Sequence, residues 1–192
     1  TGATGFIGLH TAKKLLDEGH QVFALVRSAS QHQMLQSWGV KLVFGSLEKI
    51  REVKIPQVNG VIHLAGLIKA RSKQEYFQVN TEATRHLLKT LDPHSLKKFV
   101  FVSSLSARGP NKEKDHPLGL GPMSAYGKSK LEAEEIVCSY QSQFPVCIVR
   151  PPIVYGPGDL ETFSFFKMFK WGFFPKIGSK KLAGKIFVLT GT

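Results

Sequence analysis

Thr1-Gly2-Ala3-Thr4-Gly5-Phe6-Ile7-Gly8 opens the chain and places three glycines three residues apart. An amphipathic pattern follows at once, with apolar residues at positions 7, 9, 12, 15 and 16 among polar and charged ones. This pattern predicts a tight turn that opens a helix. Because a helix amino terminus offers free N–H groups and the positive end of the dipole, the stretch predicts a phosphate site. Taken alone, it also fits a glycine-rich turn that only packs against a sheet.

The spacing of Gly2, Gly5 and Gly8 differs from the G-x-G-x-x-G fingerprint of dinucleotide-binding folds. The expected roles are the same: Gly2 allows positive φ, Gly5 allows a diphosphate to approach the backbone, and Gly8 allows the helix to lie close to a strand. Such a loop normally follows a buried strand, and the sequence starts inside the loop. We therefore expect a chain that is truncated at both ends.

The charge balance is strongly basic, with 26 Lys and Arg against 14 Asp and Glu. It favours an anionic partner, namely a nucleotide, a phosphorylated substrate, nucleic acid or a membrane surface. No apolar run is long enough to span a bilayer and no signal peptide is present, so a cytoplasmic location is expected. Cys138 and Cys147 predict buried thiols rather than a disulfide or a metal site.

Apolar runs and helical patterns alternate along the chain. We expect strands over residues 21–26, 41–44, 60–64, 99–102 and 146–149, helices over 31–38, 75–91 and 124–141, and a loop over 105–122. The alternation predicts an α/β fold, a Rossmann-type doubly wound parallel sheet. Residues 1–150 would form this domain. Residues 151–192 would begin a small C-terminal substrate domain, in which residues 182–192 are left unplaced.

Arg27 stands at the end of the second strand of the expected dinucleotide fold. An acid at this place hydrogen-bonds the ribose 2′-hydroxyl of NAD, whereas an arginine accommodates the 2′-phosphate of NADP. The sequence has Arg27 and Ser28 here and no acid, which favours NADP(H). The alternative is that Arg27 is a solvated cation of the loop.

Tyr126 and Lys130 are four residues apart on an expected helix and therefore share one face. A phenol titrates near about 10, and a nearby ammonium favours the phenolate. Such a tyrosine can exchange a proton with a substrate hydroxyl or carbonyl. Ser103 and Ser104 follow a central strand, at the sheet edge where ligands bind in open α/β folds. Each of these features alone also fits a surface pair or a strand-end serine.

Taken together, the chain resembles the extended short-chain dehydrogenase/reductase family, also called the NAD-dependent epimerase/dehydratase family. The matching stretches are TGATGFIG (residues 1–8), HLAG (63–66), NTEAT (80–84), VSS (102–104), YGKSK (126–130) and RPPIVYGPGD (150–159). They stand in the family's order and spacing and cover about residues 1–178.

The resemblance implies a role for each matching residue. Tyr126 would be the general acid/base, Lys130 would tune it and hold the nicotinamide ribose, and Ser104 would orient the substrate oxygen. Asn80 corresponds to a helix asparagine that supports the active site. Cofactor contacts are implied for Gly2, Thr4, Gly5, Phe6, Ile7, Gly8, Arg27, Ser46, Leu47, Leu64, Ala65, Gly66, Ser103, Tyr126, Lys130, Pro151 and Ile153. No metal is expected.

Two departures bear on the branch of the family. Ser46 stands where many relatives have an Asp that contacts adenine, which weakens that contact. The missing acid after the second strand argues against the NAD-using sugar-nucleotide epimerases. Leu-Val-Arg at this place (residues 25–27) is more similar to the reductase branch, which includes dihydroflavonol reductases and related hydroxysteroid or aldehyde reductases.

The expected function is therefore that of an oxidoreductase that moves a hydride between NADP(H), or alternatively NAD(H), and a secondary alcohol, ketone or aldehyde. Two alternatives stay open: an NAD-dependent nucleotide-sugar epimerase or dehydratase, and a non-catalytic dinucleotide-binding protein. The expected partners are a small-molecule substrate and a second copy bound through the helix around Tyr126. A specific nucleic-acid partner is not expected, and membrane association is disfavoured but left open.

The end of the chain carries two further patterns. Residues 162–177 interleave aromatic residues with lysines, which favours a substrate wall over an interfacial membrane helix or a stacking surface for single-stranded nucleic acid. Residues 185–192 (KIFVLTGT) predict a strand followed by a Thr-Gly turn, similar to the first strand of a nucleotide fold. We expect this segment to fill the central-strand position beside the Gly2 loop.

Overall fold

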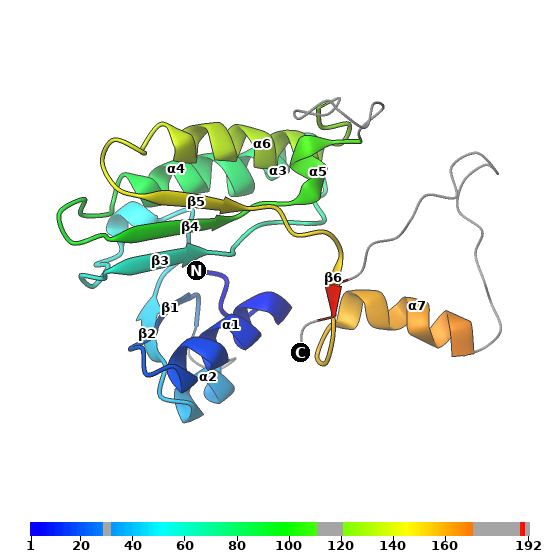
Figure 1. Ribbon diagram of the computed structural model, residues 1–192, viewed down its shortest axis with the longest axis horizontal. Coiled ribbons are helices and arrows are strands. Elements are labelled where there is room, and N and C mark those ends of the chain that lie inside the picture. Colours follow the sequence, from blue (N-terminus) through cyan, green and yellow to red (C-terminus); the bar gives the residue numbers. More distant parts are fainter. Residues whose placement is uncertain (29–31, 111–120, 171–188, 191–192) are drawn as a thin grey trace. The chain divides into compact units, whose positions relative to one another are not determined.

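Parallel strands build the first of two units into which the chain divides, Thr1–Pro151 and Pro152–Thr192. The computed structural model describes residues 1–28, 32–110, 121–170 and 189–190 (Figure 1). In the first unit β1 (Phe23–Val26) pairs with β2 (Lys41–Phe44). A second sheet has the order β3 (Gly60–His63), β4 (Lys98–Val102), β5 (Val146–Val149). Each of these pairings is parallel, which confirms the predicted α/β class.

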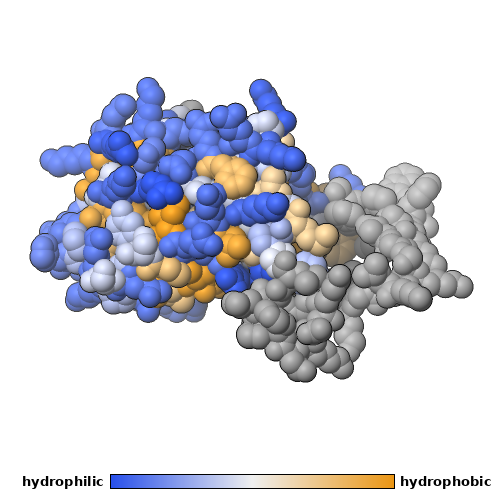
Figure 2. Space-filling view, turned by 90° about the horizontal axis from the view of Figure 1, so that it is seen from above, coloured by the Kyte–Doolittle hydropathy of each residue, from blue (hydrophilic) through white to orange (hydrophobic). Residues whose placement is uncertain are grey.

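Helices cover these strands. Figure 1 shows α3, α4 and α6 over one face of the β3–β4–β5 sheet, and α1 and α2 beside β1 and β2. Their bounds are Phe6–Asp17 for α1, Gln33–Ser37 for α2, Lys73–Tyr76 for α3, Ala83–Leu88 for α4, Leu105–Arg108 for α5 and Ala125–Cys138 for α6, with a 3₁₀ turn η1 at Ile50–Glu52. The space-filling view shows the face above α4 and α6 as mostly hydrophilic, with hydrophobic residues between the charged ones (Figure 2).

Two apolar clusters hold these layers together. Phe99 and Phe101 of β4 are fully buried and belong to one cluster with Leu87 of α4 and Val137 of α6. The other cluster joins α1, β1 and α2 through side chains that include Ala12, Ala24 and Leu35. The central strand β4 is thus the part of the sheet that the helices shield most from water.

The predicted helix over residues 75–91 is not one regular α-helix. Between α3 and α4 the backbone forms a π-helical segment, η2 (Phe77–Glu82), which contains the buried Asn80 and Thr81. π-Turns add one residue to a helical turn and occur frequently at functional sites. A sequence period of 3.6 residues does not reveal such an insertion.

Two other expectations were wrong in part. The predicted loop over residues 105–122 begins with the short helix α5, because Ser104 Oγ accepts a hydrogen bond from Ser106 N (3.1 Å) and so caps it. Residues 111–120 of that loop lie outside the described part. Cys138 is exposed at the end of α6 rather than buried.

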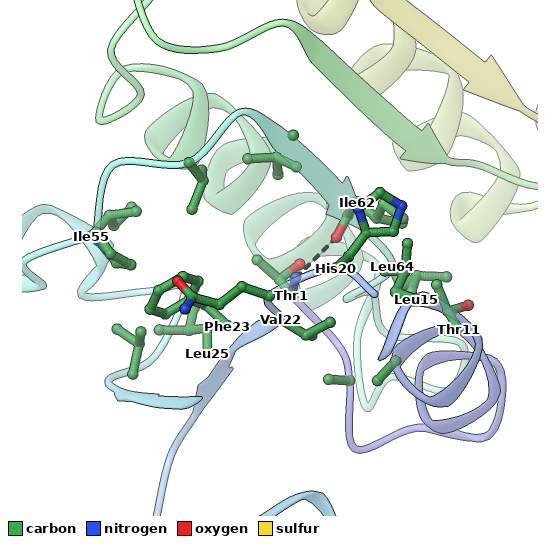
Figure 3. A pocket seen from close by; sticks show the side chains of 18 of the residues that line it. Thr1, Thr11, Leu15, His20, Val22, Phe23, Leu25, Ile55, Ile62 and Leu64 are labelled. Atoms are coloured by element: carbon green, nitrogen blue, oxygen red, sulfur yellow. Dashed lines mark hydrogen bonds between the residues drawn. The ribbon is translucent and has the colours of Figure 1, made fainter. Parts of the chain in front are cut away.

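A cavity of about 530 Å³ lies between the edges of β1 and β3, which belong to separate sheets (Figure 3). Its lining is mainly apolar and includes Val22, Leu25, Val61 and Ile62. Thr1 lies at its border, where Thr1 N donates to Ile62 O (2.9 Å) and Leu64 N donates to Thr1 O (3.2 Å). These two bonds follow the pattern of a parallel ladder. The cavity therefore has the place and the lining of one more parallel strand that would run into Thr1.

The second unit contains β6 (Val154–Tyr155), α7 (Leu160–Lys170) and β7 (Leu189–Thr190). Asp159 directly precedes α7, and its carboxylate accepts a hydrogen bond from Glu161 N (2.9 Å). β7 pairs with β6, with Leu189 opposite Val154. The prediction that residues 185–192 fill the central-strand position is therefore wrong for Leu189 and Thr190, and residues 186–188 lie outside the described part.

An extended apolar segment fused before Thr1 is expected to stabilise the first unit, because it would bury apolar side chains in the cavity and pair with both strand edges. An extension Lys-Val-Leu-Val-Val should raise the thermal midpoint by at least about 5 °C, since about 1 kcal/mol moves the midpoint of a domain of this size by about 2–4 °C. The control is Lys-Ser-Gly-Ser-Gly, which has the same length and charge. Equal midpoints for the two extensions would contradict the assignment of the cavity.

Candidate active site

The glycine loop is closed by contacts between backbone atoms. Gly2 has φ +74°, and a Cβ built on it would lie 2.5 Å from Ala65 N. A Cβ on Gly8 would lie 2.0 Å from Gly2 O. Side chains at Gly2 and Gly8 are therefore excluded because the loop packs against the end of β3 and against its own helix. The positive φ predicted for Gly2 is confirmed, whereas the atoms nearest to a Cβ on Gly8 belong to Gly2 and Ala3 of the loop and not to a strand.

Gly5 differs from these two glycines. It precedes α1 with φ −79°, and a Cβ built on it would meet only Gly2 O, at 3.5 Å. No side chain caps α1 and no acid stands in its first turn. The first amides of α1 have no partner within the helix, and its positive end faces the open space beside Gly5. A helix terminus of this kind can bind an anion such as a diphosphate, and a side chain at Gly5 would crowd that position.

Other residues with implied cofactor contacts lie in this loop or elsewhere in the first unit. Thr4 is exposed and, with Leu9, lines a cavity of about 320 Å³ whose other wall is His32, Met34 and Leu35. The ring of Phe6 contacts His10 edge-on, with 5.2 Å between centroids, and Ile7 O accepts from Thr11 Oγ1 (2.8 Å). The cofactor contacts implied for Leu47 and Leu64 stay predictions. Leu47 packs against the β4 core, and Leu64 lines the cavity between β1 and β3.

An acid that the sequence reasoning missed lies near Arg27. Arg27 is exposed directly after β1, as predicted, and Ser46 follows β2. A hydrogen bond with the Ser46 side chain is the main cause that lowers the pKa of Glu48, and the nearby Arg27 guanidinium lowers it further. Glu48 is therefore a carboxylate within electrostatic reach of Arg27. It comes from the loop after β2, so a search for an acid directly after β1 does not find it.

Tyr126 and Ser104 meet at the amino-terminal end of α6. Burial is the main influence on the Tyr126 phenol and raises its pKa, a hydrogen bond with Ser104 lowers it, and Tyr76 raises it. The sequence predicted a lowered pKa through Lys130, and the structure gives the opposite direction. The ring of Tyr76 lies 6.0 Å from that of Tyr126 between centroids, and its hydroxyl donates to Ile68 O (2.9 Å). Tyr76 is a neighbour that no sequence motif indicated.

Lys130 is buried and turned toward the strand. Its Nζ donates to Val102 O (2.9 Å) and lies 4.2 Å from the centroid of the Phe101 ring. Burial lowers the pKa of Lys130 to about 8, while Glu134 acts in the opposite direction. A Cβ on Gly66 would come within 3.7 Å of this Nζ, so Gly66 leaves the space beside the ammonium open.

The side-chain amide of Asn80 connects η2 to two neighbouring segments. Its Oδ1 accepts from Leu67 N (2.7 Å), and its Nδ2 donates to Leu67 O (3.1 Å) and to Ser129 Oγ (3.0 Å). Ser129 Oγ in turn donates to Tyr126 O (2.7 Å). Ser129 is thus a third residue that the sequence reasoning missed, although it stands inside the YGKSK stretch.

His63 connects the glycine loop to α4. Its Nδ1 lies 2.6 Å from Thr1 Oγ1 and its Nε2 lies 2.8 Å from Thr84 Oγ1. Burial, followed by neighbouring positive charges that include Lys130, lowers the pKa of His63 well below its usual value. The ring is therefore a neutral bridge between two hydroxyl groups.

Ser103 carries a buried hydroxyl without a hydrogen-bond partner in the described structure. Such groups are rare in folded proteins, and one at a strand end fits a place for a polar ligand. Pro151 O accepts from Leu105 N (3.0 Å), which ties Pro151 to the segment that follows Ser104. Ile153 is exposed and belongs to the second unit, so its predicted place beside the nicotinamide stays a prediction.

Two other kinds of site, a metal centre and a membrane span, are absent from the described residues. Within them, no three or more His, Cys, Asp or Glu side chains gather as metal ligands would. No described helix has the length and apolar character that crossing a bilayer requires. In the second unit, Lys167 Nζ lies 4.7 Å from the Phe163 ring centroid, and Phe163 and Phe166 are about half exposed.

Comparison with known proteins gives one family. The model of the NAD dependent epimerase/dehydratase family matches residues 1–172. A ceramide reductase of Caulobacter vibrioides is 34% identical over 170 residues, which are 88% of this chain and 49% of that protein. A UDP-glucose 4-epimerase of Vibrio cholerae is 31% identical over 181 residues, which are 85% of this chain and 53% of that protein. The chain thus spans about half the length of the curated relatives it matches.

One solved structure is similar to this chain in fold and, to a lesser degree, in sequence. UDP-glucuronic acid 4-epimerase from Bacillus cereus, determined in complex with NAD, superimposes with a TM-score of 0.70 at 26% identity. The match covers 89% of this chain and 61% of that one. This similarity agrees with the Rossmann-type arrangement of parallel strands and helices described above.

Gly5→Ala is expected to separate binding from folding. The added methyl meets no atom closer than 3.5 Å and φ is ordinary, so the thermal midpoint should not fall. The methyl group would occupy the space at the α1 amino terminus, so the dissociation constant for NADH should rise at least about tenfold. This is a loss of about 1.4 kcal/mol of binding free energy. Gly8→Ala, by contrast, should lower the midpoint because its Cβ would overlap Gly2 O. Fluorescence titration and thermal melting measure both effects, and unchanged affinity in Gly5→Ala would contradict the diphosphate site.

Proposed function

The chain belongs to the NAD-dependent epimerase/dehydratase family, and from that premise we propose that it is the dinucleotide-binding part of an NADP(H)-dependent oxidoreductase acting on a ketone, an aldehyde or a secondary alcohol. The observation that carries the proposal is the meeting of Tyr126 and Ser104 beside the buried Lys130 at the end of β4. These are the groups that a carbonyl reduction needs: a proton donor, a hydrogen bond to the oxygen and a fixed positive charge.

The residues present fit a nicotinamide dinucleotide. Gly5 and the first amides of α1 would hold the diphosphate, Arg27 the adenosine end, and Lys130 the nicotinamide ribose. The unpaired hydroxyl of Ser103 would gain a partner. When bound, the nicotinamide supplies or accepts the hydride, and the protein supplies position and electrostatics.

Tyr126 would act as the acid in the reductive direction. Its raised pKa keeps the phenol protonated at neutral pH, so that it can donate the proton to the carbonyl oxygen. Ser104 would orient that oxygen through a second hydrogen bond. A charged Lys130 nearby favours the phenolate that remains, so the rate of reduction should decline as pH rises above about 8, where Lys130 loses its proton.

The second candidate is a nucleotide-sugar epimerase or dehydratase. It is supported by the UDP-glucose 4-epimerase among the relatives and by the epimerase structure with NAD. Arg27 after β1 favours the reductase, and so does the similarity to the ceramide reductase. Glu48 near Arg27 acts against the arginine at the adenosine end, because its carboxylate would oppose a 2′-phosphate. Pairing of two copies through α6 remains a proposal for either enzyme.

Tyr126→Phe should lower turnover by at least about 10²-fold, the usual contribution of a positioned acid, and leave cofactor affinity nearly unchanged. Tyr140→Phe is the matched control, because Tyr140 packs against Phe144 in the core and lies outside the site. The assay follows NADPH consumption with aromatic and aliphatic ketones and aldehydes, and NADPH binding by fluorescence. If Tyr126→Phe turns over as fast as the parent, the catalytic assignment fails; if the parent binds cofactor but never turns over, a binding protein is favoured.

The relative affinities for NADPH and NADH test the roles of Arg27 and Glu48 at the adenosine end. NADPH is expected to bind more tightly than NADH. Arg27→Gln should weaken NADPH by about tenfold and NADH little, because one ionic contact to the phosphate is lost. Glu48→Gln should strengthen NADPH selectively. Arg51→Gln, an exposed arginine on η1, is the control for net charge. Tighter binding of NADH by the parent chain would reverse the preference and favour the epimerase.

A further inference from the structure

Glu134 is a buried carboxylate to which the reaction outlined above assigns no role. It is 3% exposed and lies on α6 one turn after Lys130. Arg150, directly after β5, holds it from the other side: Nε donates to both carboxylate oxygens, at 2.9 and 3.1 Å, and Nη2 donates to Oε2. A buried carboxylate costs free energy unless it is paired, and here an arginine fork supplies the partner.

The surroundings of Lys130 leave it short of polar contacts. Besides Val102 O, its Nζ faces the Phe101 ring, and neighbouring positions of α6 are fully buried apolar residues such as Ala133 and Val137. Since residues four apart on a helix are neighbours, Glu134 is the carboxylate of α6 placed to compensate this ammonium. Glu132 and Glu135 of the same helix are exposed.

The charged and titratable groups on the elements around Lys130 fall into three sets. On α6 itself, they are the protonated phenol of Tyr126 and the exposed Lys128, Glu132 and Glu135. On and after the strands, His63 of β3 is neutral, Lys98 of β4 is exposed and Arg150 is engaged by Glu134. On the packed helices, the groups are Lys73, Glu75 and Tyr76 of α3, Glu82 of η2 with its partner Arg85 of α4, His86 of α4, and Arg108 of α5.

We propose that Glu134, fixed by Arg150, is a positioning residue that acts through Lys130: its buried carboxylate, one helical turn away on α6, favours the charged form of the Lys130 side chain at the end of β4. The proposal deepens the proposed function, because a lysine that were neutral in its buried site would neither hold a ribose hydroxyl firmly nor stabilise a phenolate. Burial lowers the pKa of Lys130 to about 8, and Glu134 is the neighbour that raises it. Arg150 orients the Glu134 carboxylate, so the segment directly after β5 takes part in fixing the charges along α6.

The test measures the titration of Lys130 directly and needs neither cofactor nor substrate. In a chain with ¹³C-labelled lysine, the Cε resonance of Lys130 is assigned by its loss in Lys130→Met and followed against pH. Glu134→Gln is expected to lower its midpoint by about one pH unit or more, because an opposite charge within a few ångströms shifts a pKa by about that much. Glu135→Gln makes the same change at the exposed neighbouring position and should leave the midpoint where it is.

A second variant protects the test against loss of folding. Glu134→Gln leaves Arg150 without its carboxylate, so we also replace the whole pair in E134M/R150M, since apolar replacement of a buried ion pair is often neutral or stabilising. Its Lys130 midpoint should fall as in Glu134→Gln. An unchanged titration midpoint of Lys130 in either folded variant overturns the proposal. The Glu134–Arg150 ion pair would then only connect α6 to the end of β5. If the midpoint falls but the parent shows no turnover, the proposed function fails while the role of Glu134 stands.

Discussion

The side chain of Asn80 is the constraint on which the arrangement of the site depends. Its amide joins three segments: the loop after β3 at Leu67, the π-turn η2, and α6 at Ser129. All of these hydrogen bonds are made by one buried side chain. Removing it would leave buried donors and acceptors unpaired, and each unpaired group would lower the free energy of unfolding by about 1–3 kcal/mol. The π-turn is part of this arrangement, because Thr84 Oγ1 donates to Asn80 O (2.7 Å) one turn later. Tyr126 is therefore held by a network that begins far from it in the sequence.

Burial sets the electrostatics of the site. It disfavours the charged forms of Tyr126 and Lys130 alike, so the pKa of the phenol rises and that of the ammonium falls. Burial thus drives the pKa values of the two groups apart, so that Lys130 loses its proton at a lower pH than Tyr126 does. A charged or polar ligand group placed between them changes these pKa values more than it would in water, because the protein interior screens charge poorly. Because fixed charges act strongly in such an interior, a site whose groups are already oriented before a ligand binds is effective.

Much of this could be predicted from the sequence, and the limits have physical causes. Periodicity and glycine spacing predicted the parallel strands, the helix after Gly5 and the close approaches at Gly2 and Gly8, because each follows from local backbone geometry. The π-turn, the Glu134–Arg150 pair and the approach of Glu48 to Arg27 depend on which segments the fold brings together. The lowered pKa expected for Tyr126 was wrong for a related reason: proximity on a helix face says nothing about desolvation or about the rotamer that turns Lys130 toward Val102.

The glycine loop and the sheet depend on each other. Gly2 packs on the backbone of Ala65 at the end of β3, and Thr1 forms a short parallel ladder with the same strand. No bulky side chain fixes the loop, since Gly2, Gly5 and Gly8 have none. Its conformation is therefore maintained through β3, and β3 in turn borders the cavity that separates it from β1. A ligand that binds the ordered loop must stabilise this part of the sheet, and a group that fills the cavity must by linkage strengthen the binding of that ligand.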